Sequence, residues 1–501
     1  MMSTASGARS VLTVTFLLAV AGDLLLRAFP WGINFSIAAL LLFAGIVLLA
    51  RRLGDVLPRE VWPVLGLGVV TAGCLAWRDS DELAAFNVLA TLMAAALVVA
   101  RKRDGELVRM TFADHLSQMF LQAIHLTAGF GFLLLSDLRA KGDGSRHGRW
   151  GRAWLGIALA VPALLVFGSL LTSADATFEY VIEEVLQIDF WRLMGHAAVI
   201  GLLGWTVGGV LRGRFFAADV TLPTDLRPKG LTLGITEVAI VLGTLDLLFA
   251  AFVGVQIPYF FGGHGAVLGT PSLTYAEYAR RGFFELITVA LLSLPLLLAA
   301  DWLLRTENAR ERRIFRALAL LMIALLGVML GSGMHRLMLY MEAYALTTAR
   351  VNAGAILVWV GSTLVLFCAT VLRGKRNLLP FSMALSALVV LIGLNALNPD
   401  ALVARVNLAR MASEGKFDPR YTTRLSADAV PDLLGALPSM EERTRSDLAV
   451  ELLTRYAGAP SDLDLRSWNA SRAKARALVR ERESLLRGFV LASPTPEEGC
   501  R

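Results

Sequence analysis

The sequence predicts an all-α protein: a polytopic transmembrane helix bundle of about 11 spans, followed by a small extramembrane C-terminal helical domain. Hydrophobic residues make up 56% of the chain, against roughly 45–50% in soluble proteins. They form runs close to the ~20 residues that a helix needs to cross a bilayer, separated by short charged loops. From about residue 398 these runs stop, and the chain becomes charged with mixed sign.

These patterns predict a transmembrane domain over residues 1–397 and a C-terminal domain over residues 398–501. The first apolar run also resembles a signal-peptide core with a cleavage site at Ala19-Val20-Ala21, so it is either the first span or a removed leader. The predicted spans are residues 11–29, 32–50, 60–77, 83–100, 153–171, 191–211, 232–254, 282–304, 315–333, 351–371 and 378–395.

Basic residues gather in alternate loops, which predicts the orientation of the chain. The loops at 79–82 and 172–190 contain no Lys or Arg. Because basic loops stay in the cytoplasm, the N-terminus is predicted to be cytoplasmic and the C-terminal domain extracytoplasmic. The net charge of +7 has the same origin, so nucleic-acid binding is not predicted. The basic loops are residues 51–59, 101–109, 139–152, 212–229, 305–316 and 373–376.

Residues 112–135 are long enough to span a membrane, yet basic loops flank them on both sides. Their polar residues share one helical stripe, which favours an amphipathic helix lying on the inner membrane surface. The alternative is a spanning helix whose polar stripe lines a cavity. The stripe consists of Asp114, His115, Gln118, Gln122 and His125.

The C-terminal domain is predicted to contain four or five short helices that could bind a protein partner. Ser439 and Glu442 have the spacing of a capping box, which predicts a helix that continues to about Tyr456. Another helix is expected to open near Ser426, and a long last helix is expected over 467–489.

Soluble-enzyme motifs are absent from the sequence: it has no Walker A loop, no H-E-x-x-H and no G-x-S-x-G. No catalytic residue, metal or cofactor is therefore predicted. The remaining candidates are ionisable residues inside spans, which cost roughly 2.5–3.5 kcal/mol each at a helix centre. Asp246, near the middle of its span, is the clearest, whereas Asp23 is expected to pair with Arg27 one turn later.

Three consecutive outer ends of spans bring Arg, Glu and Tyr to one depth of the membrane. One interpretation is an interfacial aromatic belt with charge pairs such as Glu277 with Arg281. The other is an outward-facing polar pocket for an anionic headgroup or phosphate, with Asp246 deeper as a coupling carboxylate. The cluster consists of Gln256, Tyr259, Tyr275, Glu277, Arg280, Arg281, Glu285, Arg336, Tyr340, Glu342, Tyr344 and Arg350.

The acidic outer loops permit a different hypothesis. Asp79 and Asp81 have the D-x-D spacing of metal-dependent glycosyl transfer, and Asp175 and Glu179 are predicted to lie on the same side. Topology alone also predicts outer loops poor in basic residues, so this pattern is weak evidence for a metal.

The second half of the chain resembles the uncharacterised bacterial membrane family catalogued as domain of unknown function 4173, related to the 4153 family. The resemblance rests on "LDLLFAAFVGVQIPYFFGG" (245–263), "LTYAEYARRGFFEL" (273–286), "RLMLYMEAYALTTARVNAGAILVW" (336–359) and "LNALNPDALVARVNLAR" (394–410). In the family's pattern, Gly stands at the position of Ala345. The resemblance implies a polytopic protein of the bacterial inner membrane with a helical tail, and it implies no activity.

The leading functional hypothesis is non-enzymatic transport, flipping or sensing of an envelope component through the outward-facing cluster. The expected partners are the lipid bilayer, an anionic lipid or envelope precursor, and a protein that binds residues 398–501. One alternative is a membrane glycosyl- or group-transferase acting on a lipid-linked substrate. Another is a scaffold or signalling regulator that acts through the C-terminal domain.

Overall fold

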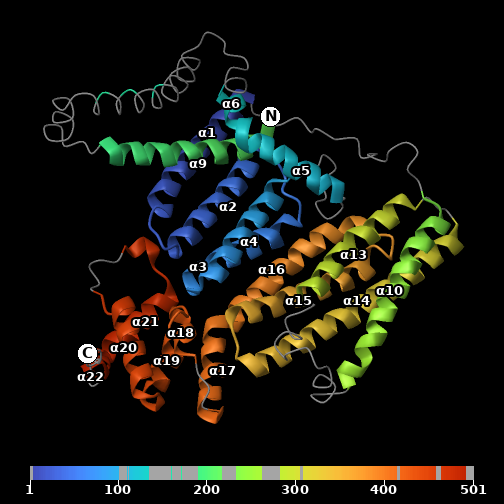
Figure 1. Ribbon diagram of the computed structural model, residues 1–501. Coiled ribbons are helices and arrows are strands. Elements are labelled where there is room, and N and C mark those ends of the chain that lie inside the picture. Colours follow the sequence, from blue (N-terminus) through green and yellow to red (C-terminus); the bar gives the residue numbers. More distant parts are fainter. Residues whose placement is uncertain are drawn as a thin grey trace, which may run out of the picture.

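The structure is a computed structural model that describes residues 4–100, 112–134, 190–216, 233–261, 283–304, 308–414, 418–458 and 464–491, with single residues between them. These residues form helices and, within these ranges, no strand (Figure 1). Leu233 and Leu304 make one isolated parallel bridge. The predicted all-α class is confirmed.

Nine of the described helices are long and apolar enough to cross a membrane, which confirms a multi-pass membrane protein. A tenth predicted span corresponds to the shorter apolar helix α3 (Val61–Trp77), and the span predicted at 153–171 lies almost entirely outside the described residues. The nine helices are α1 (Thr4–Leu26), α2 (Ile33–Leu53), α4 (Asp81–Val99), α9 (Phe190–Phe216), α10 (Ile235–Phe261), α13 (Phe283–Leu303), α14 (Ala309–Tyr344), α15 (Thr348–Thr370) and α16 (Leu379–Leu397).

Helices α1–α4 and α9 pack around one apolar core, which includes Ile46, Leu49 and Leu75. The predicted pair of Asp23 with Arg27 is present at 2.8 Å, and His196 of α9 also contacts Asp23. The polar-striped segment forms α5 (Phe112–Ile124), a π-helical turn (His125–Gly129) and α6 (Phe130–Phe132), and packs on α9. Gly209 permits this contact, because a Cβ there would lie 2.1 Å from the His125 carbonyl oxygen. Whether this segment spans the membrane or lies on its surface stays a prediction.

Helices α10 and α13–α16 form a second bundle around Phe315, Met322 and Phe367, all fully buried. Its longest member, α14, begins at the cap Asn308, whose side chain accepts a hydrogen bond from the Arg310 backbone. With 36 residues α14 is about 54 Å long, whereas a bilayer core is ~30 Å thick. The helix therefore continues well past the predicted span 315–333.

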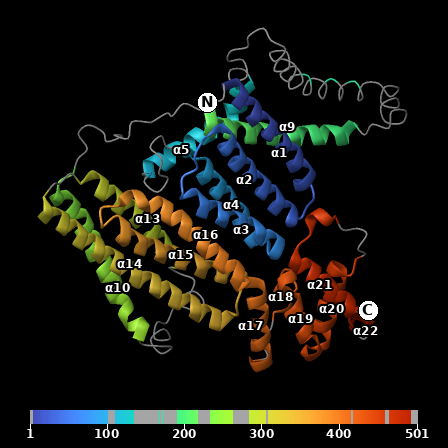
Figure 2. The same ribbon diagram turned by 180° about the vertical axis from the view of Figure 1, so that it is seen from behind.

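Helix α16 joins the two bundles, since it packs on α15 and also on α3 and α4 (Figure 2). Asn395 of α16 and Asn87 of α4 exchange two side-chain hydrogen bonds of 2.9 and 3.0 Å. Both side chains are fully buried, and each amide satisfies the other where water is absent.

The C-terminal helices, α17–α22, lie at one end of the membrane bundles (Figure 1). Their core includes Val403, Leu433, Leu448 and Val479. They comprise α17 (Pro399–Glu414), α18 (Pro419–Thr422), α19 (Val430–Ala436), α20 (Glu442–Tyr456), α21 (Ala470–Glu481) and α22 (Glu483–Leu491), with 3-10 turns at Ala427–Ala429, Leu437–Ser439 and Leu465–Ser467; a further 3-10 turn, Arg376–Leu378, lies between α15 and α16.

Two details of the predicted C-terminal helices were wrong. The helix that ends at Tyr456 begins at Glu442 with no side-chain cap, because Ser439 belongs to the preceding 3-10 turn and its hydroxyl donates to the Ala436 carbonyl. The predicted long last helix is two helices, α21 and α22, which meet at Arg482. The helix start near Ser426 is confirmed, since the Ser426 side chain accepts from the Asp428 backbone.

Ala345, between α14 and α15, has φ 68° and ψ 166°, a conformation that only Gly adopts without strain. This geometry favours Gly over Ala at position 345. Ala345→Gly is expected to raise the free energy of unfolding by about 1 kcal/mol, measured by chemical unfolding of the protein in detergent. Ala343→Gly, inside the last turn of α14, is the control and is expected to destabilise it by about 1 kcal/mol. Equal effects of both changes would contradict the assignment of strain to Ala345.

Candidate functional site

Arg350 is the centre of the part of the predicted outer cluster that the structure brings together. Its guanidinium lies 4.0 Å from the Tyr340 ring centroid, and the rings of Tyr340 and Tyr344 are 5.2 Å apart. Arg350 Nη1 donates to the carbonyl oxygens of Tyr344, at 3.0 Å, and Ala345. Among the described residues, the ion pairs include neither Arg350 nor Glu342.

Arg410 of α17 joins this cluster, although the sequence did not single it out. Its Nη2 donates to the Ala343 carbonyl at 3.2 Å. Two arginines from different helices thus satisfy carbonyls at the C-terminal end of α14, where a helix has unpaired acceptors and a partial negative charge.

These arginines line a groove of about 1230 Å³ between α14, α15, α16 and α17. The groove exists because Asn398 adopts a left-handed conformation and Pro399 then starts α17 in a new direction. Glycines and alanines in its lining leave the space between the helices unfilled, and most of the lining is apolar. The lining includes Met338, Met341, Glu342, Arg350, Gly354, Val358, Val390, Gly393, Leu397, Val406, Ala409 and Arg410.

The other predicted site residues are distributed over three helices. Asp246 and Gln256 are buried on α10, and neither side chain has a hydrogen-bond partner in the part of the chain that the structure describes. Arg336 is half-buried on α14, and Glu285 is exposed at the start of α13. The side chain of Tyr259, and all of Tyr275, Glu277, Arg280 and Arg281, lie outside the described residues.

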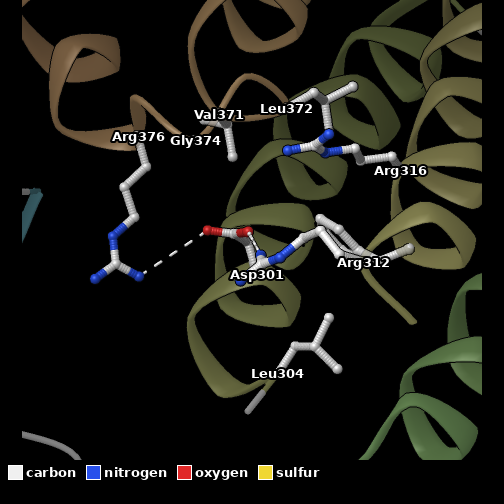
Figure 3. A pocket seen from close by; sticks show the side chains of 9 residues that line it. Asp301, Leu304, Arg312, Arg316, Val371, Leu372, Gly374 and Arg376 are labelled. Atoms are coloured by element: carbon white, nitrogen blue, oxygen red, sulfur yellow. Dashed lines mark hydrogen bonds and ion pairs between the residues drawn. The ribbon is translucent and has the colours of Figure 1, made fainter. Parts of the chain in front are cut away.

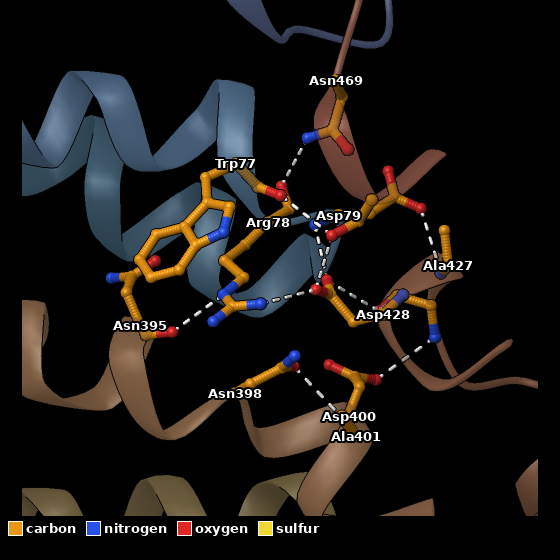
Figure 4. A network of polar contacts seen from close by, with 12 residues as sticks. Trp77, Arg78, Asp79, Asn395, Asn398, Asp400, Ala401, Ala427, Asp428 and Asn469 are labelled. Atoms are coloured by element: carbon orange, nitrogen blue, oxygen red, sulfur yellow. Dashed lines mark hydrogen bonds and ion pairs between the residues drawn. The ribbon is translucent and has the colours of Figure 1, made fainter. Parts of the chain in front are cut away.

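The acidic loop between α3 and α4 docks the C-terminal helices on the membrane bundles (Figure 4). Asp428, which is buried, accepts hydrogen bonds from Arg78 Nη1 at 3.2 Å, from the Asp79 backbone at 2.8 Å and from the Ser471 hydroxyl at 2.7 Å. Arg78 also donates to the Asn395 carbonyl at 2.8 Å and stacks on Trp77. This docking network, built on Arg78, Asp79, Asp428 and Arg472, links the bundles to α21.

Asp79 pairs with Arg472 at 3.3 Å and accepts from the Ala427 backbone at 3.2 Å. Burial outweighs this ion pair and raises the pKa of Asp79 to about 6, and burial also lowers the pKa of Arg472. The D-x-D motif thus has a docking role: Asp79 faces a cation of the protein itself, and Asp81 points to the exterior. Within the described residues, no group of three His, Cys, Asp or Glu side chains is placed to hold a metal, and Asp175 and Glu179 lie outside them.

Other contacts hold the C-terminal helices at the same end of the bundles. The Asn407 side chain bonds both the backbone N–H and the carbonyl of Leu346, at 3.0 and 2.9 Å. The Trp468 carbonyl accepts from the Ile33 backbone at 2.8 Å. The loops after predicted spans one, three, nine and eleven therefore all contact the C-terminal helices. These spans are all odd-numbered, so a chain that crosses the membrane at each span would have these four loops on the same side. Which side of the membrane this face occupies stays a prediction.

The family model of a domain of unknown function, DUF4153, matches residues 65–436. No curated protein and no solved structure matches the chain. The matched region begins in α3 and ends with α19, so it includes the groove, most of the second bundle and part of the docking network. The expected resemblance to the 4173 family stays a prediction. Because the match covers well over half of the sequence, the chain belongs to the DUF4153 family.

Proposed function

We propose that this protein binds an anionic amphiphile of the bacterial cell envelope, a lipid or lipid-linked precursor, in the groove between α14–α16 and α17. The observation that carries the proposal is the lining of the groove, which is largely apolar and includes two arginines, Arg350 and Arg410. Apolar walls suit acyl chains, and guanidinium groups are the side chains best suited to bind an acidic headgroup.

The position of the groove supports an amphiphilic ligand. Three of its walls are helices long and apolar enough to cross a membrane, and the fourth, α17, belongs to the C-terminal helices. A ligand there lies at the end of the spans, where acyl chains enter from the bilayer while the headgroup meets water. Arg350 can also donate hydrogen bonds to the headgroup. Both of its hydrogen bonds to carbonyl oxygens come from Nη1, so the N–H groups of Nε and Nη2 are not used in them.

Sensing is the activity that this geometry supports best. Helix α17 forms one wall of the groove and also contributes Val403 and Ala404, both fully buried, to the core of the C-terminal helices. A ligand that separates α17 from α14 would therefore alter the packing of the C-terminal helices. Transport is the second candidate, because the buried carboxylate of Asp246 has no partner among the described residues and is a site for a coupling proton or cation.

Blocking the groove tests the proposal. A Cβ at Gly393 meets nothing within 4 Å, so Gly393→Phe is expected to fill the groove without disturbing the fold. Lipid extracted from the purified protein and measured by mass spectrometry should then fall by at least about tenfold for the bound species, the equivalent of ~1.4 kcal/mol. Gly361→Phe on α15 is the matched control, because its position is equally open and lies outside the groove.

Retention of the same lipid by Gly393→Phe would refute the proposal, as would equal loss in Gly361→Phe. Asp246→Asn separates the two activities. If the protein is a carrier, this variant should keep the lipid and lose its transfer across reconstituted vesicles. If it is a sensor, the variant should behave as the wild type in both measurements.

A further inference from the structure

A second cavity, of about 340 Å³, lies at the opposite end of α14 from the groove (Figure 3). It is formed where α13 ends, α14 begins and α15 turns into α16. Its charged lining consists of one aspartate and three arginines, Asp301, Arg312, Arg316 and Arg376. Apolar contacts from Leu304, Phe315 and Leu372 complete the wall.

Asp301 holds two of the arginines toward the cavity. It is buried, and its two carboxylate oxygens face different partners: Oδ1 lies 2.9 Å from Arg312 Nη1, and Oδ2 lies 4.0 Å from Arg376 Nη1. Figure 3 shows the three guanidinium groups on different sides of this carboxylate. An ion pair with a buried aspartate restricts the rotamers of a long side chain, which lowers the entropy lost when a ligand binds.

The charges and donors of the cavity do not balance. Three guanidinium groups and one carboxylate leave two positive charges, and each guanidinium carries five N–H donors whereas a carboxylate accepts about four hydrogen bonds. Arg312 and Arg376 keep 37% and 42% of their side-chain surface exposed, so their remaining donors stay accessible. A tetrahedral oxyanion with several acceptors is the group that several converging arginines recognise best.

We propose that this arginine cavity binds a phosphate group, carried either by the headgroup of an anionic phospholipid or by a soluble phosphate compound. Its volume is at the lower end of the range of small-molecule sites, which suits a phosphate with a small substituent and excludes an acyl chain. The surrounding sequence adds Arg310, Arg373 and Lys375 against one acidic residue, Glu311, so the cavity lies in a basic part of the chain, and basic segments beside a membrane attract anionic lipids. The site is separate from the groove and does not depend on the function proposed for it.

Binding measurements on the full-length protein test this assignment. The protein in a zwitterionic detergent is titrated with phosphatidylglycerol, cardiolipin or inorganic phosphate, and occupancy is followed by native mass spectrometry. Arg316→Glu is expected to lower the affinity for the bound probe by at least about tenfold, since it removes a charged donor and adds a like charge. Arg376→Ala, at the junction of α15 and α16, is also expected to lower the affinity for the probe.

Arg313→Glu is the matched control. Arg313 lies on the same turn of α14, is exposed, and donates to the Ala309 carbonyl without lining the cavity. Affinity should therefore change little in this variant, and melting temperatures establish that each protein is folded. Binding of the lipids but not of inorganic phosphate would assign the site to a headgroup, and binding of inorganic phosphate alone would assign it to a soluble compound. Failure of all three probes to bind the wild type would overturn the proposal. So would unchanged affinity in both Arg316→Glu and Arg376→Ala, or an equal loss in Arg313→Glu.

Discussion

Asp428→Ala is expected to weaken the docking of the C-terminal helices on the membrane bundles by about 3–5 kcal/mol. The carboxylate of Asp428 is the common acceptor for the Arg78 guanidinium, the Asp79 backbone N–H and the Ser471 hydroxyl. Its removal leaves the guanidinium of Arg78, which is only 11% exposed, without its carboxylate partner. A buried charge that loses its partner is among the most destabilising single changes in a protein.

Hydrogen–deuterium exchange of the purified protein measures this effect. The backbone amides around 426–429 and 469–472 should lose protection in Asp428→Ala, while those of α10 and α14 keep theirs. Asp432→Ala is the control, because Asp432 lies four residues further on and pairs at 3.6 Å with Arg405, whose side chain is 59% exposed. An exposed pair contributes about 0–1 kcal/mol, so exchange should barely change. Full protection in Asp428→Ala would show that the apolar contacts alone hold the C-terminal helices in place.

Asp79→Asn is expected to remove a pH dependence of stability. The pKa of Asp79 is raised from 3.8 to about 6, because burial outweighs the attraction of Arg472, and Asp428 and Asp81 add repulsion. The folded protein therefore binds a proton more tightly than the unfolded chain does. The protonation of Asp79 therefore stabilises the folded protein below pH 4, and this stabilisation is lost as the pH rises through 6. A difference of about two pKa units corresponds to about 3 kcal/mol.

The measurement is chemical unfolding of the wild type and of Asp79→Asn in detergent between pH 4 and pH 8. The free energy of unfolding of the wild type relative to the variant should fall by about 3 kcal/mol from pH 4 to pH 7 and stay constant above that. Titrating groups that do not interact with Asp79 are common to both proteins and cancel in the difference. A relative stability that rises with pH would mean that the ion pair with Arg472 outweighs the cost of burying Asp79.

The membrane-spanning helices were predictable because their signal is local. A run of apolar residues between charged loops requires no knowledge of other parts of the chain, so α1–α4 and α13–α16 follow from composition and length. The pair of Asp23 with Arg27 is predictable for the same reason, since helix geometry alone brings residues four apart together.

The contacts that organise the candidate sites were not predictable in this way. Asp79 and Asp428 are 349 residues apart, and a D-x-D motif in a loop gives no indication that its partner is an arginine of α21. Arg350 was expected to belong to a polar cluster, yet its contacts with Tyr340 and with the end of α14 depend on the turn at Ala345. The arginine cavity was regarded only as a basic loop, because clusters of arginines outside a bundle are what topology predicts.

The length of α14 has a mechanical consequence. Its first turns supply Arg312 and Arg316 to the arginine cavity, and its last turns supply Met338, Met341 and Glu342 to the groove. A continuous helix transmits a shift or tilt along its whole axis, because its length is fixed by backbone hydrogen bonds. The groove and the arginine cavity thus share one helix, and a ligand that displaces α14 at one of these two proposed sites is expected to move the wall of the other. By thermodynamic reciprocity, any effect of the first ligand on the affinity for the second is matched by an equal effect in return.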